Sequence, residues 1–288
     1  MTVYNVTMLD GGDYECVVKS SVNEISSKTN VVIEGAPGAP GGVQVIDIAK
    51  TKAIIEWVDG AANGRPILYY NILGRTNWNR TWVNVSTHVQ AREVDRYTSR
   101  QQAEVTNLTP WSSYEFSVAA VNDLGIGTPS TPSPIYSTHE DRPYIAPRNV
   151  GGGGGKIGDL TITWDPLLPQ EQHSYGIHYK VFYRLKGKFE WATEIINRPN
   201  NVGIAVIKNI PINNYYTEYE VKVQAINNVG MGPESEPVVI YSAEDMPQVA
   251  PQKPIIQPFN STAFNVTWRP IDMTRENIRG KLIGYRVR

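Results

Sequence analysis

Apolar residues occupy every second position in three stretches of the chain, and each stretch ends on a tryptophan. A period of two is typical of a β-strand that packs one face on a core and exposes the other to water. The predicted core-facing residues are Ala53, Ile55, Trp57, Leu160, Ile162, Trp164, Phe264, Val266 and Trp268. The residues expected to face solvent are Glu56, Thr161, Thr163, Asn265 and Thr267.

A second strand is predicted 13 to 17 residues after each tryptophan, with the pattern Tyr-x-Ile or Tyr-x-Val. It begins at Tyr70, Tyr179 and Tyr285. A later strand alternates over residues 114–120 and again over residues 219–225, and both copies end in the turn sequence Asn-x-x-Gly-x-Gly. No helical period of useful length occurs, so an all-β fold is expected.

These patterns form an internal repeat. The three tryptophans are 107 and 104 residues apart, and a period near 105 residues is the size of one β-sandwich domain. The repeat predicts two complete units, residues 37–140 and 141–246, and the N-terminal part of a third, residues 247–288.

The segment before the repeat carries the motif D-x-G-x-Y-x-C, formed by Asp10, Gly12, Tyr14 and Cys16. The motif resembles the corner before the F strand of an immunoglobulin domain, where the tyrosine hydroxyl bonds to upstream backbone. The resemblance implies that residues 1–35 are the C-terminal part of such a domain and that the disulfide partner of Cys16 is absent from the chain. An ordinary buried thiol in an unrelated fold is the alternative.

On this interpretation Val3, Tyr4 and Val6 belong to strand E, residues 14–18 to strand F and residues 28–33 to strand G. The strands before E would precede Met1, so the chain is expected to be a fragment or an incomplete gene model.

The repeat resembles fibronectin type III domains. The residues that carry the resemblance are the strand B tryptophan, the strand C Tyr-x-Ile/Val, and Leu108, Pro110, Tyr114, Phe116, Val118, Ala120 and Asn122. The predicted architecture is therefore a series of tandem β-sandwiches. Between Ile210 and Tyr216 the second unit has three extra residues. The sequence therefore does not decide which tyrosine of this unit bonds back to upstream backbone at the corner before the next strand.

Residues 78–85 and the glycine-rich residues 151–156 are similar to insect contactins. This resemblance implies a cell-adhesion glycoprotein on the extracellular face of the plasma membrane, held by a GPI anchor beyond Arg288. It also implies neurexin-like and neuroglian-like cell-surface partners in septate junctions.

Charge and composition exclude several other functions. Lys plus Arg number 27 against 28 Asp plus Glu, which leaves no basic field for nucleic acid. No apolar run approaches the length of a membrane helix, so membrane contact is expected only through the missing anchor.

No catalytic residue, cofactor, metal site or small-molecule substrate is predicted. His173 and His178 are expected in a solvated loop, and their spacing on an extended stretch does not favour a metal site. Gly153, Gly155 and Gly158 match a dinucleotide fingerprint formally, but they precede a strand rather than open a helix. Residues 63–65, Asn-Gly-Arg, are expected to form a tight turn; an integrin ligand produced by deamidation is the alternative.

Acceptors for N-linked glycans are more frequent than chance predicts. Six occur, against roughly 2.6 expected from composition, which favours secretion. They are Asn5, Asn79, Asn84, Asn107, Asn260 and Asn265. We expect Asn79 in the turn after strand C and Asn265 on the water side of strand B, whereas Pro110 disfavours use of Asn107.

Trp78 lies in the polar turn of residues 76–80. The alternating pattern of core-facing residues does not extend into this turn, so it does not explain a large aromatic ring there. We predict that it is covered by a stacked arginine, by a sugar on Asn79 or by a partner protein. An adhesion ectodomain is the leading hypothesis. A second hypothesis is the ectodomain of a receptor phosphatase or kinase, which the domain architecture alone does not exclude. A muscle-type intracellular array is disfavoured by the acceptors and by Cys16.

Overall fold

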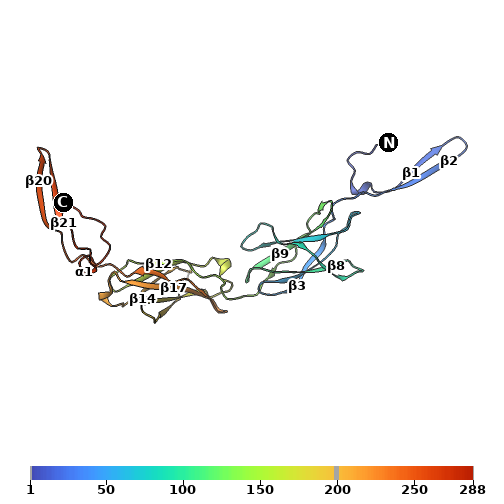
Figure 1. Cartoon of the computed structure of the whole chain (residues 1–288). Helices are drawn as coiled ribbons and strands as arrows, with labels where there is room; N and C mark the ends of the chain where they lie inside the picture. The colour runs from blue at the N-terminus through green and yellow to red at the C-terminus, as the bar shows by residue number, and fades with distance from the viewer. Residues whose placement is uncertain (1, 198–200, 288) are drawn as a thin grey trace. The chain divides into compact units, whose positions relative to one another are not determined.

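The computed structural model describes residues 2–197 and 201–287, and it confirms an all-β fold (Figure 1). The chain divides into two compact units between Asp141 and Arg142. The outer limits of the two predicted terminal fragments, Met1 and Arg288, lie outside the described residues. Among the described residues the α-helix α1 (Arg275–Ile278) has a single turn, and none of their helices could cross a membrane.

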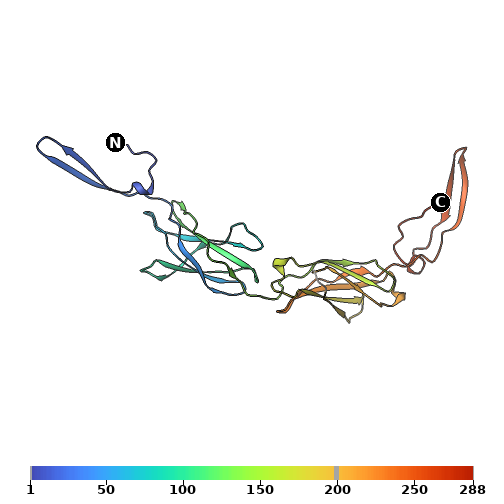
Figure 2. The same ribbon diagram turned by 180° about the vertical axis from the view of Figure 1, so that it is seen from behind.

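The first unit contains a sandwich of two antiparallel sheets (Figures 1 and 2). One sheet has the order β3 (Gly41–Ile48), β4 (Ala53–Val58), β8 (Arg100–Val105), β7 (Arg92–Asp95). The other has the order β10 (Gly125–Ile126), β9 (Ser113–Asn122), β5 (Tyr69–Thr76), β6 (Val83–Val89), with β11 (Tyr136–Ser137) also paired to β9. Each predicted strand is present.

Between these sheets lies the core that the alternation predicts. Ile55 and Trp57 of β4 and Ile72 of β5 are fully buried, and Phe116 and Val118 of β9 complete the centre. The Trp57 ring meets the Tyr70 ring edge-on, with centroids 4.9 Å apart. Burial of this many large apolar groups is the main stabilising term of the unit.

The second unit repeats the sandwich. One sheet has the order β12 (Arg148–Gly152), β13 (Leu160–Asp165), β16 (Ile204–Ile207). The other has the order β15 (Ala192–Ile196), β14 (His178–Leu185), β17 (Glu218–Ile226), β18 (Met231–Glu234), with β19 (Val238–Tyr241) also paired to β17. Two short 3-10 turns, η2 (Pro169–Glu171) and η3 (Ile212–Asn214), lie in loops. Leu160, Ile162, Val181, Val221 and Val223 are fully buried between the sheets.

The repeated Asn-x-x-Gly-x-Gly turn has a physical reason. In the first unit the Asn122 side-chain oxygen accepts hydrogen bonds from the backbone N–H groups of Leu124 and Gly125, at 2.9 and 3.2 Å. Asn227 does the same in the second unit. A Cβ on Gly127 would lie 2.1 Å from the Pro37 carbonyl oxygen, so only glycine fits where the turn meets the entering chain.

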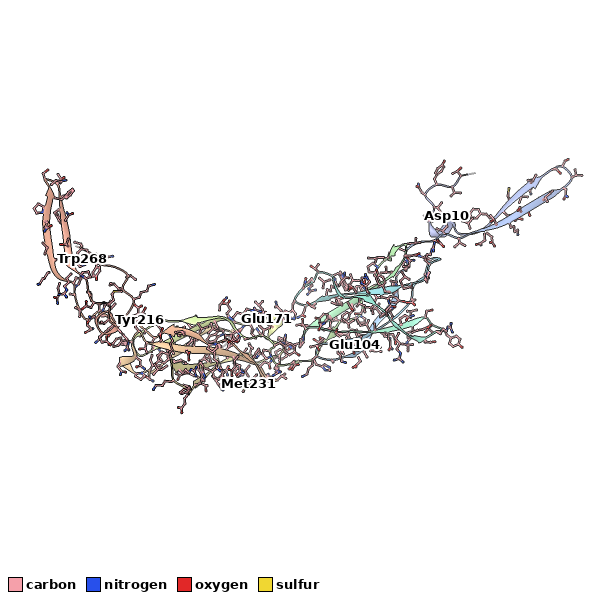
Figure 3. All side chains as sticks on the ribbon, in the orientation of Figure 1. Asp10, Glu104, Glu171, Tyr216, Met231 and Trp268 are labelled. Carbon is pink, nitrogen blue, oxygen red and sulfur yellow. The ribbon has the colours of Figure 1, made fainter. Side chains whose placement is uncertain are left out.

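At the two ends of the chain the strands form isolated hairpins. β1 (Gly12–Lys19) pairs with β2 (Glu24–Val31), and β20 (Gln252–Asn260) pairs with β21 (Ala263–Arg269). In Figure 3 their side chains project from a single layer of backbone, and Trp268 is labelled at the base of its hairpin. The predicted strand E at Val3, Tyr4 and Val6 is wrong, because this stretch is irregular and exposed; η1 (Met8–Asp10) follows it.

Two predictions for residues 247–288 are also wrong. Residues 279–287 form no strand, although Tyr285 was expected to begin one, and Phe264 is exposed rather than in a core. A buried β-strand needs a hydrogen-bonded neighbour and a covering sheet. Among the described residues, 279–287 pair with no strand, and Phe264 pairs with β20 but has no sheet over it. Instead Tyr285 lies against Trp268, with ring centroids 5.4 Å apart, and its hydroxyl accepts a bond from the Ile271 N–H.

Glu56 does not face water, which corrects another prediction. Its side chain is 8% exposed on the outer face of β4, under long polar side chains from both neighbouring strands. Gln44, Gln102 and Arg100 donate hydrogen bonds to its two carboxylate oxygens at 3.0, 2.8 and 3.0 Å. A residue on the solvent side of a central strand is therefore buried by its cross-strand neighbours.

Candidate interaction and glycosylation sites

All six asparagines that begin an N-x-S/T motif are exposed. Asn79 lies in the turn between β5 and β6, Asn84 on β6, and Asn107 between β8 and β9. Asn260 ends β20, Asn265 lies on β21, and Asn5 lies in the irregular N-terminal stretch. Each amide nitrogen could therefore carry a sugar without disturbing a core.

Asn79 is held by the turn in which it lies. The Thr76 N–H donates to the Asn79 carbonyl oxygen at 2.8 Å, so Asn77 and Trp78 are the central residues of the turn. The Asn79 side-chain oxygen accepts a bond from the Thr81 N–H at 3.0 Å, which fixes the asparagine and the threonine of the motif relative to each other.

Trp78 is 38% exposed, and its contacts within the structure are specific. Its indole N–H donates to the Ser112 hydroxyl at 3.0 Å, and its ring lies 6.1 Å from that of Trp111. The Arg75 guanidinium stacks on Trp82, 4.7 Å from the ring centroid. The polar edge of Trp78 is thus satisfied by its own domain, while part of its apolar ring faces solvent.

The N-terminal hairpin shows the tyrosine contact that its motif implied. The Tyr14 hydroxyl donates to the Asp10 carbonyl oxygen at 2.7 Å, and Thr7 holds the Asp10 carboxylate. The hydrogen bonds from the Thr7 backbone N–H and then from its hydroxyl lower the pKa of Asp10. Cys16 is an exposed free thiol on β1. The immunoglobulin assignment of residues 1–35 and the missing disulfide partner stay predictions.

Both complete sandwiches place a tyrosine hydroxyl at the start of the strand before the Asn-x-x-Gly-x-Gly turn. Tyr114 accepts a bond from the Thr109 N–H at 2.8 Å. In the second unit Tyr219 occupies this place, and its hydroxyl accepts from the Asn214 side chain at 2.9 Å. The extra residues that obscured the alignment include η3, which carries Asn214.

The sequence patterns missed a row of alternating cations and rings on the outer face of β14 and β17. Lys222 lies 4.8 Å from the ring centroids of both Phe182 and Trp191. Arg184 also stacks on Trp191, 4.3 Å from its ring centroid, and pairs with Glu220 at 2.6 Å. The first unit has a shorter version in Arg75, Trp82 and Glu115. Comparison of the two repeats at these positions could have revealed it.

The remaining sequence candidates lie in structural contacts. His173 is buried rather than solvated: its Nδ1 lies 3.1 Å from the Arg142 carbonyl oxygen, and Tyr144 packs edge-on against its ring. His178 lies at the start of β14 with its Nδ1 2.8 Å from the Gly176 carbonyl oxygen. Among the described residues no three potential metal ligands cluster.

The Asn-Gly-Arg sequence forms a tight turn, as expected. Asn63 and Gly64 both have positive φ, 52° and 79°, and the Arg65 N–H closes the turn on the Ala62 carbonyl oxygen at 3.3 Å. The Arg65 guanidinium forms an ion pair with Glu34 at 2.7 Å. The glycine run begins with the last two residues of β12 and continues into the loop before β13, which agrees with a connection between strands A and B.

Comparison with known proteins adds sequence evidence to this geometry. The fibronectin type III domain family matches residues 38–136. The chain is 81% identical to Contactin of Drosophila melanogaster over all 288 residues. Its structure resembles the FN1-FN3 domains of chicken CNTN1 with a TM-score of 0.64 and 35% identity, over 83% of this chain and 78% of that one. The chain belongs to the contactin family.

Vertebrate contactins are homologues of it as well. Human Contactin-2 is 36% identical over the full 288 residues. The chain spans 21% of the length of the Drosophila contactin and 27% of that of human Contactin-2. The family match covers the first sandwich, and the structural likeness extends over 83% of the chain, so the contactin relationship agrees with the all-β fold.

Proposed function

We propose that this chain is a non-catalytic, glycosylated part of a cell-adhesion protein on the extracellular face of the plasma membrane. The observation that carries the proposal is the contactin relationship over all 288 residues. The six exposed acceptors support it, because N-linked glycosylation requires passage through the secretory pathway. By relationship, the whole protein carries a GPI anchor and contacts neurexin-like and neuroglian-like proteins in septate junctions.

Within the chain, we propose residues 37–140 and 141–246 as complete fibronectin units, with parts of an immunoglobulin and a third fibronectin domain at residues 1–35 and 247–288. The two separate cores support the inner boundaries. The tyrosine contact of Tyr14 supports the immunoglobulin assignment. A disulfide from Cys16 to a cysteine outside this chain belongs to the same proposal.

The test uses the full-length protein displayed on cultured cells. We expect cells that carry it to bind cells that display neurexin-like or neuroglian-like ectodomains. Enzymatic cleavage of GPI anchors should release it from the surface. Retention after cleavage together with a cytoplasmic catalytic domain would favour the receptor alternative, and absence of sugar from every acceptor would favour the intracellular array.

A further inference from the structure

The turn between β5 and β6 holds an exposed aromatic ring next to a glycosylation acceptor. Trp78 is fixed from two sides, since its N–H donates to Ser112 and the preceding Asn77 exchanges two hydrogen bonds with the Ser113 backbone, at 3.0 and 3.1 Å. A ring anchored in this way loses little conformational entropy when something covers its exposed face.

The acceptor beside it is equally constrained. The Asn79 N–H donates to the Thr76 hydroxyl at 2.9 Å, and the Asn79 side-chain oxygen accepts from Thr81. With its oxygen engaged, the amide presents Nδ2 on its other side. That nitrogen would bond to C1 of the sugar and lose a proton, while the lipid pyrophosphate of the oligosaccharide donor leaves.

We propose that the first N-acetylglucosamine of a glycan on Asn79 packs on the exposed face of Trp78 and becomes a structural part of this turn. The sugar ring has an apolar C–H face, and covering an indole with it removes apolar surface from water. The proposal rests on the secretion that the proposed function implies.

The strand that follows this turn provides a matched control. Asn84 is also exposed and lies on β6 two residues after Trp82, but the ring of Trp82 already carries the Arg75 guanidinium at 4.7 Å. A glycan on Asn84 should therefore leave stability unchanged, whereas one on Asn79 should raise it.

The experiment is a double-mutant cycle on the full chain, secreted with a signal peptide and trimmed to single N-acetylglucosamine residues. We expect Thr81→Ala, which removes the Asn79 motif, to lower Tm by about 2–4 °C in the Trp78 background. In the Trp78→Ala background the same change should have no effect. Ser86→Ala, which removes the Asn84 motif, should have no effect in either background. Asn79→Gln serves as a second way to empty the site.

A direct readout is the proton NMR shift of the N-acetyl methyl group on Asn79, which should move upfield under the indole ring and return in Trp78→Ala. Additive effects with an unshifted methyl would overturn the inference. If Asn79 carries no glycan while Asn84 and Asn265 do, the inference about Trp78 is wrong but the proposed function stands. If no acceptor carries a glycan, the proposed function is wrong as well. Weaker partner binding by Trp78→Ala, with no effect of the glycan on Tm, would replace the glycan with a protein contact.

Discussion

The two complete sandwiches and the C-terminal hairpin carry the same alternating pattern with different results. Trp57 and Trp164 are 0% and 4% exposed in their sandwiches. On β21, Phe264 is 62% exposed at a position aligned with buried residues of β4 and β13. The pattern therefore determines which face of a strand is apolar, but partner strands determine whether that face is buried.

Strand pairing explains the difference. β4 lies between β3 and β8, with the second sheet across the core, and β13 lies between β12 and β16. Among the described residues β21 pairs with β20 alone. A two-stranded hairpin without a covering layer is marginally stable in water.

Amide exchange should show the largest effect. Amides in the centres of β9 and β17 should exchange only through global unfolding, which costs about 5–15 kcal/mol in a domain of this size. Amides of β1, β2, β20 and β21 should exchange within seconds to minutes. Exchange by mass spectrometry after pepsin digestion measures this, and slow exchange in either terminal hairpin would contradict the comparison.

Replacement of the tryptophans tests whether the sandwiches and the C-terminal hairpin also differ in how much a side chain contributes to stability. Trp57→Ala or Trp164→Ala should destabilise its own sandwich by about 3–5 kcal/mol, because each leaves a large cavity. Trp268→Ala should cost less than about 1 kcal/mol, since its ring is only partly covered. Urea denaturation measures the losses, and a small effect of Trp57→Ala would show that this ring does not anchor the core.

The third prediction concerns the buried Glu56 carboxylate. The hydrogen bond from Gln102 is the main cause that lowers the pKa of Glu56, and burial opposes it. A carboxylate with a lowered folded pKa stabilises the protein above its unfolded value, near pH 4.5, and loses this contribution as pH falls through the folded value.

Glu56→Gln should therefore cost about 1–3 kcal/mol at neutral pH, because its amide places donors against Arg100 and Gln102. The stability of the variant should depend less on pH below 4.5. Denaturation curves from pH 3 to 7 check this, with Glu104→Gln on the exposed side of β8 as the control. Parallel pH dependence of the wild type and Glu56→Gln would contradict it.

Glu56 also shows how far sequence reasoning reaches. Alternation predicted the core faces of β4, β5 and β9 and of β13, β14 and β17, because a period of two is a local property of the chain. Burial of Glu56, and of His173 against Arg142 and Tyr144, depends on residues far away in sequence. The same holds for the row of cations and rings, whose members come together only through strand register.

The smallest expected effect is a difference between the two sandwiches in the coupling of arginine to tryptophan. Arg75 and Arg184 stack on Trp82 and Trp191 at 4.7 and 4.3 Å, and each pairs with a glutamate directly across the strands. Double-mutant cycles should give a coupling of about 0.5–1 kcal/mol for each arginine–tryptophan pair. In the second sandwich Lys222 shares Trp191, so Lys222→Met should change the coupling of Arg184 and leave that of Arg75 intact. If the two arginine–tryptophan couplings are equal and Lys222→Met changes neither, the two cations on the Trp191 ring do not influence each other.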